Sequence, residues 1–351
     1  MAQWLESPFL TIGFSHYIIT FCVCIIVFVV VMKIARTFQD NRRFAELHRN
    51  NSTASGLCEY SECVRCRRHD EVLLRARTRL SYCDDQDGSS EIQKSSAWLS
   101  LLKDIETSKC KLTSVVNSAK EGGEHEHAQN PLVLQIKGLQ AKPEWNVEDF
   151  PGLHMLSEQF YTIKSEFCNM FQELASNGFC SQLWKVNDTP SGRWMICHLL
   201  DQGRATDAVS CCPVTWKTIT SLPSAVTGNL FGNAAFSVME PGTTVSPHFG
   251  PTNIRIRCHL GLQVPSLCEL QVGVNTLHWQ EGGLLCFDET FLHSVECGVD
   301  RSNHFKQKKV SGFDQQNDVT HHRAVLIVDL WHPDLTEEQK SIIDFAFSPY
   351  N

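Results

Sequence analysis

The chain of 351 residues is 42% hydrophobic and 20% charged, so it can bury a sizeable core and is neither collagen-like nor disordered throughout. Its 31 basic residues against 39 acidic ones leave a net charge of −8, which provides no overall cationic field and argues against nucleic acid as a partner. One large domain with a smaller accessory region is expected.

A long apolar segment follows a short N-terminal tail of residues 1–6. Residues 7–32 contain no acid, lysine or arginine, and a membrane-spanning helix needs about 20 such residues. A cleaved signal peptide would have a basic leader and a small-residue cleavage site, whereas Glu6 precedes this run and Lys33 ends it. The segment is therefore predicted to be a transmembrane anchor.

The orientation of this anchor receives opposing signals. Basic residues such as Lys33 and Arg36 follow the span, and the positive-inside rule would then keep the body of the protein in the cytosol. Glycosylation sequons at residues 50–53 and at Asn187 favour a lumenal body instead. The 16 cysteines, most of them outside the span, fit an oxidising lumen without showing which of them pair.

Residues 33–142 are predicted to form a stalk or small helical region with a linker. Its tract "EVLLRARTRL" is typical of an amphipathic, solvated helix. His125 and His127 stand in a charged, glycine-rich stretch and are interpreted as linker residues. Three thiols and a histidine lie close together in this region and could hold zinc: Cys58, Cys63, Cys66 and His69. Their spacing is not that of a standard zinc finger, and a local disulfide or unpaired thiols are equally compatible with it.

The main domain is predicted to span residues 143–351. Apolar residues recur at helical spacing from Leu153 to Leu174, which predicts a helix of about six turns. After it come short apolar stretches separated by Pro, Gly and Asn, such as "AAFSVM", "IRIRCHLGLQV" and "AVLIVDLW". Many short strands at this spacing predict a mainly β fold, either an antiparallel sandwich or a double-stranded barrel.

The predicted strand "NIRIRCHLG" carries charge in an unusual place. Strand alternation sends Arg255, Arg257 and His259 to one face and the apolar residues to the other. If that face is the interior of a barrel, the two guanidiniums need an anion. Arginine matches carboxylates in bidentate fashion, so a small di-acid is favoured. A polar outer face on an exposed sheet is the alternative.

Two histidines stand at predicted strand ends near this stretch. His248 lies just upstream, and His293 follows in "FDETFLHSV". Two imidazoles from neighbouring strands suit non-haem Fe(II), whose usual site consists of two histidines and one carboxylate. The carboxylate normally stands two residues after the first histidine, and this chain has Gly250 there.

Three long motifs are similar to the catalytic domain of the aspartyl/asparaginyl β-hydroxylase family: "FSVMEPGTTVSPHFGPTNIRIRCHLGL", "FDETFLHSV" and "RAVLIVDLWHPDLTEEQ". Within it, the chain most resembles the aspartate β-hydroxylase domain-containing proteins, which share a short anchor and a "SECVRC"-like element. The resemblance implies a double-stranded β-helix (jelly-roll, cupin-like) with flanking helices, and an oxygenase that uses Fe(II), 2-oxoglutarate and O2. It also implies that the acidic ligand is missing, so Gly250 follows the family pattern.

Site residues follow from the resemblance motif by motif. His248 and His293 would bind the metal, with water or another small ligand in the vacant position, and Arg323 would clamp the distal carboxylate of 2-oxoglutarate. Asp288 and Glu289 could orient a metal-bound water, and ordinary surface acids are the alternative interpretation. The other residues implied for the co-substrate pocket are Trp194, Ser237, Arg257, Cys258 and His259.

The chain departs from the family pattern between His293 and Arg323, where 29 residues intervene (294–322). The polar, breaker-rich excess is interpreted as a surface loop inserted at about 298–322, which a fold tolerates well. His321 and His322 directly precede the arginine and could compete for metal. His304 is expected to be solvated.

An active hydroxylase of Asp- or Asn-type side chains in a polypeptide is the favoured function. The resemblance also favours a single-pass type II glycoprotein of the endoplasmic reticulum or secretory pathway with a lumenal catalytic domain, a cytosolic-facing body being the alternative. A catalytically silent, membrane-anchored scaffold that keeps the fold is a second function class, and halogenation at the vacant ligand position is a third. The chain lacks the helical repeat with which family hydroxylases hold their polypeptide, so neither the substrate protein nor the oligomeric state is predicted.

Overall fold

The computed structural model describes residues 60–82, 95–108, 128–176, 179–187, 189–299 and 321–349. All of them belong to the compact unit Ser55–Asn351, so the boundary predicted at residue 143 does not divide two units. The predicted anchor at 7–32, the sequons at 50–53 and most of the predicted insertion lie outside the described residues. No helix within the described ranges is long and apolar enough to cross a bilayer.

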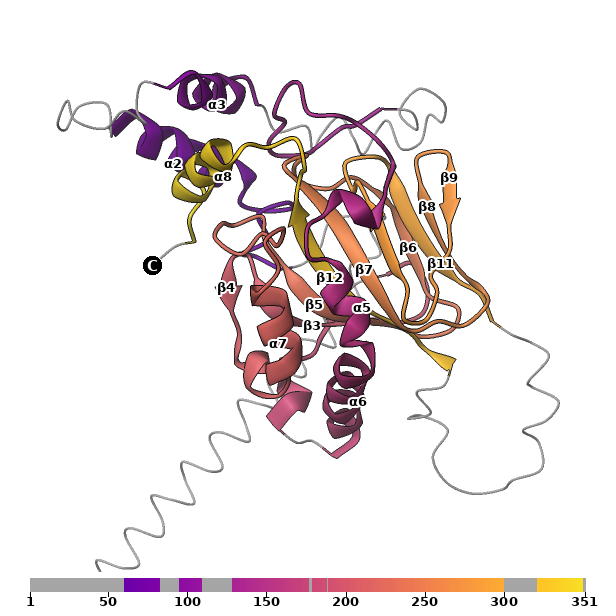
Figure 1. Ribbon diagram of the computed structural model, residues 1–351. Coiled ribbons are helices and arrows are strands. Elements are labelled where there is room, and N and C mark those ends of the chain that lie inside the picture. The colour runs from indigo at the N-terminus through magenta and orange to yellow at the C-terminus, as the bar shows by residue number, and fades with distance from the viewer. Residues whose placement is uncertain are drawn as a thin grey trace, which may run out of the picture. The chain divides into compact units, whose positions relative to one another are not determined.

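Most helices of the described chain precede β5 (Ala234–Met239), and the strands from β5 to β12 (Arg323–Trp331) follow one another before the last helix (Figure 1). The helices are α2 (His69–Tyr82), α3 (Ser96–Thr107), α5 (His154–Glu158), α6 (Phe160–Ser176), α7 (Pro213–Thr220) and α8 (Glu337–Ala346), with short 3-10 turns η3 (Val147–Asp149), η4 (Phe179–Leu183) and η5 (Asp207–Ser210). The strands are β1 (Glu144–Trp145), β2 (Lys185–Asn187), β3 (Trp194–Asp201), β4 (Arg204–Ala205), β5 (Ala234–Met239), β6 (Thr244–His248), β7 (Arg255–Gln263), β8 (Cys268–Val272), β9 (Asn275–Leu277), β10 (Leu284–Phe287), β11 (His293–Cys297) and β12 (Arg323–Trp331).

The strands form two antiparallel sheets. The large sheet has the order β1-β10-β7-β12-β5-β3-β2, with β4 paired to β3, and the small sheet has the order β6-β11-β8-β9. From β5 onward the chain passes back and forth between the sheets, which is the strand order of a jelly roll. The prediction of a mainly β, antiparallel fold with flanking helices is confirmed.

The central strands of the large sheet sort their side chains between two cores. Alternate residues of β7 and β12 pack under α5, α6 and α7, namely Ile256, Cys258, Leu260, Ala324, Leu326 and Val328. The intervening residues face the small sheet, where Val325 and Ile327 meet residues of β8 and β11. Every residue of β12 is buried, as expected for a Val-, Leu- and Ile-rich strand covered on both faces. Arg257, His259 and Arg323 share the alternation that faces the small sheet.

The helix predicted between Leu153 and Leu174 is divided into α5 and α6. Gln159 stands between them with φ −91° and ψ 9°, outside helical geometry. The division keeps one apolar stripe against the large sheet, because Leu156, Ile163 and Phe167 are all buried in the core that β7 and β12 share.

The part predicted as a stalk is packed against the rest of the unit where it is described. Helices α2, α3 and α8 lie together (Figure 1) and share a core with Phe249, Ile254 and Trp331. Arg79 of α2 donates hydrogen bonds to backbone carbonyls after α8, including Ser348 O at 3.1 Å. These cationic contacts satisfy carbonyls that a helix end leaves open.

The zinc interpretation gains no support from the described part of the chain. Within the described ranges, no three His, Cys, Asp or Glu residues are grouped so that they could hold a metal ion. Cys63 and Cys66 lie in turns before α2, joined by a backbone hydrogen bond from Cys66 N to Cys63 O. Cys58, His125 and His127 fall outside the described residues.

We predict that α2 contributes to the stability of the whole unit. Leu80 is fully buried in the core shared with α3 and α8, so Leu80→Ala should lower the free energy of unfolding by about 2–5 kcal/mol in a single transition. Leu74 of the same helix is 62% exposed, and Leu74→Ala should have little effect. Denaturant unfolding followed by tryptophan fluorescence would measure both. A separate transition for α2, with the rest of the unit unchanged, would contradict the prediction.

Candidate active site

Two histidines stand side by side on adjacent strands of the small sheet. His248 ends β6 and His293 begins β11, and the two are directly paired with ring centroids 4.1 Å apart. The register between β6 and β11 shifts directly after His293, and such a bulge re-aims nearby side chains. The structure thus brings together the two residues predicted as metal ligands.

Both imidazoles have the protonation state that a metal ligand requires. Nδ1–H of His248 donates to Ser246 O at 2.8 Å and Nδ1–H of His293 to Phe291 O at 3.0 Å, which leaves a lone pair on each Nε2. Burial lowers the pKa of His293 to about 4 and that of His248 well below its usual range. Neutral imidazoles bind metal without first losing a proton.

Arg65 adds positive charge beside this pair. Its Nη1 donates to Phe249 O at 3.2 Å, next to His248, and its charge helps to lower the pKa of both histidines. Arg65 belongs to the "SECVRC" element, which the sequence analysis connected with family membership and zinc and not with the active site. The element before α2 therefore lies beside the paired histidines.

Gly250 has no room for a side chain. A Cβ atom there would overlap Cγ of Glu289 and lie 2.8 Å from its Cδ and 2.9 Å from its backbone oxygen. The Gly250 amide also donates to that oxygen at 2.6 Å. The space in which an acidic ligand would begin is thus filled by Glu289, which explains in physical terms why position 250 is glycine.

Glu289 belongs to a buried network of two arginines and two carboxylates. Arg255 Nε donates to Glu289 at 2.8 Å, and Arg257 Nη1 contacts the other Glu289 oxygen at 2.6 Å. Asp329 of β12 accepts from Arg255 at 2.5 Å and from Arg257 at 3.0 Å. Burial alone would raise the pKa of Glu289, but the two guanidiniums hold it well below its usual range.

This network changes the interpretation of the charged strand. Strand alternation predicts that Arg255, Arg257 and His259 share one face, and an interior face favours a di-acid beside the arginines. They do face the interior, but the anions beside Arg255 and Arg257 are the protein's own Glu289 and Asp329. Asp329 was not identified from the sequence, because an acid inside a hydrophobic strand gives no sign of its partner.

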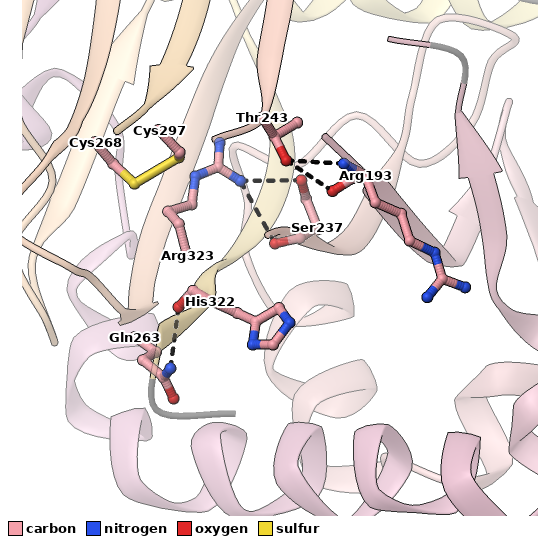
Figure 2. Close-up of a disulfide and its surroundings, with 8 residues drawn as sticks. All are labelled: Arg193, Ser237, Thr243, Gln263, Cys268, Cys297, His322 and Arg323. Atoms are coloured by element: carbon pink, nitrogen blue, oxygen red, sulfur yellow. Dashed lines mark hydrogen bonds between the residues drawn. A yellow bond between two sulfur atoms is a disulfide. The ribbon is translucent and has the colours of Figure 1, made fainter. Parts of the chain in front are cut away.

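Arg323 is the buried cation that lacks such a partner. It opens β12, is 2% exposed and forms no ion pair with any residue in the described ranges. Its Nη1 donates to the Ser237 hydroxyl at 3.1 Å, while its Nε is buried without a hydrogen bond (Figure 2). Burial lowers the pKa of Arg323 to about 9, so the guanidinium stays charged at neutral pH.

Ser237 and Trp194 complete this corner of the interior. Trp194 Nε1 also donates to the Ser237 hydroxyl, at 3.0 Å. A hydroxyl oxygen that accepts two hydrogen bonds has only its proton left to offer, so Ser237 can donate to an anion beside Arg323. The structure therefore brings together Trp194, Ser237 and Arg323, as predicted.

His259 supplies a second buried donor without a partner. Its Nδ1 accepts from Trp279 Nε1 at 3.1 Å, which places the proton on Nε2, and that Nε2 is buried without a hydrogen bond. The Trp279 ring also stacks against the Arg323 guanidinium, whose Cζ lies 4.4 Å from the ring centroid. Trp279 thus joins the two open donors, although nothing in "TLHWQ" distinguished it from a core tryptophan.

The remaining predicted residues lie away from this corner. Cys258 points to the opposite face, in the core under the helices and directly across from Cys286. His321 is exposed, and the His322 ring contacts Phe171 of α6 at 5.8 Å, on the side away from Arg323. His304 lies outside the described residues.

Asp288 is buried but organises its own loop. Its carboxylate accepts from Thr290 N at 2.8 Å and Thr290 Oγ1 at 2.6 Å, and also from Gln129. Burial raises its pKa to about 6. These contacts fix the turn that leads into His293, so neither Asp288 nor Glu289 is an ordinary surface acid.

The arrangement combines two neutral imidazoles with a pocket of unpaired donors for an anion. Phe287 lies between the two parts, with ring centroids 5.8 Å from His293 and 5.0 Å from His259.

A family model described as Aspartyl/Asparaginyl beta-hydroxylase matches residues 157–303, which include both histidines. The human Aspartate beta-hydroxylase domain-containing protein 2 is 32% identical over 299 residues, covering 83% of this chain and 70% of its own. The chain belongs to the aspartyl/asparaginyl β-hydroxylase family.

Other members of this family match smaller parts of the chain. The mouse Aspartate beta-hydroxylase domain-containing protein 1 is 40% identical over 138 residues, which cover 39% of this chain and 34% of that protein. The mouse Aspartyl/asparaginyl beta-hydroxylase is 31% identical over 213 residues, covering 59% and 26%. A Pseudomonas putida prolyl-4-hydroxylase structure is matched over 49% of this chain and 87% of its own, at 12% identity and with a TM-score of 0.28. This similarity is too low to support a conclusion about the fold. The hydroxylase family is thus shown by sequence.

We predict that this hydroxylase domain does not tolerate a side chain at position 250. Gly250→Ala should lower the free energy of unfolding by about 1–3 kcal/mol, because Glu289 is held by two arginines and cannot move aside freely. Gly250→Asp should lower it further, since it adds a second buried carboxylate.

Thermal unfolding would measure both variants. Gly283→Ala is the control, because a Cβ there comes no closer than 3.1 Å to its neighbours. A Gly250→Asp variant as stable as the wild type would show that the space beside Glu289 is open.

Proposed function

We propose that this protein is an Fe(II)- and 2-oxoglutarate-dependent hydroxylase that acts on Asp- or Asn-type side chains of a polypeptide. The observation that carries the proposal is the pairing of two neutral imidazoles, buried at His293 and partly buried at His248, with a buried guanidinium that has no counter-ion in the described ranges. A ferrous ion suits the first group and the distal carboxylate of a keto-diacid suits the second.

His248 and His293 would hold the metal through Nε2. Because each Nδ1–H is bonded to a backbone carbonyl, the rings keep one tautomer and one orientation. When bound, iron with 2-oxoglutarate and O2 supplies the oxidative decarboxylation to succinate that drives hydroxylation of a C–H bond. The protein's own part is to bind, orient and exclude water.

Arg323, Ser237 and His259 would bind the co-substrate. The open Nε–H of Arg323, the remaining proton of Ser237 and the Nε2–H of His259 are donors in a buried place, where charge-assisted hydrogen bonds to a carboxylate are strong. Trp279 restrains both Arg323 and His259, so these donors are oriented before a ligand arrives.

Glu289 would act beside the vacant ligand position. Its carboxylate fills the space next to Gly250 and can accept a hydrogen bond from a water molecule held there. Its charge helps to balance the lowering effect of burial on the pKa of His293. Arg255 and Arg257 keep the carboxylate ionised and fixed in place.

We place the catalytic unit in the lumen of the secretory pathway, behind an N-terminal anchor at residues 7–32. The disulfide Cys268–Cys297 supports this, since it links directly opposed residues of β8 and β11 and such bonds persist in oxidising compartments.

Turnover of 2-oxoglutarate tests the proposed activity. The full chain, purified in detergent and given Fe(II) and 2-oxoglutarate anaerobically, should form succinate when O2 is added. His248→Ala should lower the rate more than about 100-fold, because outer partners of metal ligands alone are worth 10–100-fold. His278→Ala is the matched control, since His278 is exposed and lies outside the site. Absence of succinate from the wild type would favour the scaffold function.

Arg323→Gln tests the co-substrate pocket separately. The KM for 2-oxoglutarate should rise at least about tenfold, because the distal carboxylate loses its cation. Arg193→Gln is the control: its guanidinium points away from Ser237 (Figure 2) and pairs with Glu240 at 3.5 Å. An unchanged KM in Arg323→Gln would exclude this pocket as the co-substrate site.

The proposed topology makes its own prediction. If the body is lumenal, the protein expressed in mammalian cells should shift to lower mass on glycosidase treatment, and Asn51→Gln should reduce that shift. An unglycosylated body, digested by protease added outside intact microsomes, would place it in the cytosol.

A further inference from the structure

Two cysteines outside the active site lie in sulfur–sulfur contact. Cys180 is in η4 and Cys211 caps the end of η5, and their Sγ atoms are 2.7 Å apart although 31 residues separate them in sequence. A disulfide bond is about 2.05 Å long, so the two sulfurs are within about 1 Å of the bonded distance.

The surroundings allow this gap to close. Both residues lie in short 3-10 turns and not in a ladder of strands, so closure disturbs no sheet pairing. The turn η4 follows α6 and packs on it, and η5 leads into α7. Cys180 and Cys211 therefore connect the two parts of the helical layer that covers the large sheet.

The exposure of Cys211 distinguishes this pair from the fully buried thiols near it. Cys180 is 4% exposed and Cys211 is half-buried, so an external reagent meets Cys211 first. Cys197 and Cys212 lie close by but are fully buried. Cys258 and Cys286 also face each other, yet both are buried in the core between sheet and helices.

We propose that Cys180 and Cys211 form a disulfide, which makes them a second cross-link beside Cys268–Cys297. The oxidant is a disulfide, either oxidised glutathione or an oxidoreductase. The Cys211 thiolate attacks it and releases one thiol, and Cys180 then attacks the Cys211 sulfur and releases the other. Two protein thiols lose two electrons and two protons, and the oxidant is reduced to two thiols.

This cross-link would hold the two parts of the helical layer together over the large sheet. Cys180 belongs to the same core as Met195 and Cys197 of β3, the strand that begins with Trp194. Closing a 31-residue loop restricts the unfolded chain. The inference does not depend on the proposed catalytic function.

Mass spectrometry of the full chain in detergent tests the inference. The protein is equilibrated in a buffer of oxidised and reduced glutathione, free thiols are blocked with N-ethylmaleimide, and the digest is analysed without reduction. We expect a cross-linked product that joins the peptides of Cys180 and Cys211 and is two hydrogens lighter than their sum. N-ethylmaleimide adducts on both cysteines after oxidation would overturn the inference.

Variants identify the partner, because Cys211 and Cys212 fall in one peptide. The cross-link should vanish in Cys211→Ser and persist in Cys212→Ser, while Cys258 and Cys286 stay reduced and become blocked only after unfolding. Oxidised Cys180→Ser should melt about 5–10 °C below the oxidised wild type. A cross-link that persists in Cys211→Ser and vanishes in Cys212→Ser would show that Cys212 carries the bond. That result would overturn the proposal.

Discussion

The interior of the two-sheet barrel is organised around four buried charges. Arg255 and Arg257 project from β7 between the sheets, and a buried guanidinium is tolerated only beside an anion. Asp329 from the neighbouring strand and Glu289 from the loop before β11 supply these anions. Removing Glu289 would leave two guanidiniums beside one carboxylate, so the network fixes where the loop carrying Glu289 lies and, through it, where His293 begins its strand.

The cations on this face of the large sheet have two kinds of surroundings. Arg255 and Arg257 are neutralised by the protein, whereas Arg323, from the adjacent strand, meets the Ser237 hydroxyl and carbonyl, a tryptophan ring and a buried donor, with no anion among the described residues. A fully paired network is rigid and offers little to a ligand, while an unpaired buried cation gains from any anion that arrives. The division between the two kinds of arginine separates the structural part of the interior from the part suited to binding.

Local patterns were enough to predict the strands and the two histidines, and the family resemblance supplied the corner formed by Trp194, Ser237 and Arg323. They succeeded because strand alternation and motif order are properties of short segments. They failed where the partner is distant in sequence: Asp329 beside Arg257, Trp279 beside Arg323, and Arg65 beside the histidines. The placement of Cys258 was also missed, because the motif carried it into the pocket while alternation turned it toward the helices. The shared core of α2, α3 and α8 could not be predicted for the same reason, since it depends on tertiary packing.

The contact between Gly250 and Glu289 bears on how this site can evolve. A variant that gained an acid at position 250 would first have to shorten or remove Glu289, and that step leaves Asp329 as the one carboxylate that pairs with Arg255 and Arg257. Each intermediate is therefore worse than either end point, which makes the two-histidine arrangement hard to leave by single substitutions. The packing around Gly250 therefore disfavours an acidic ligand at this position.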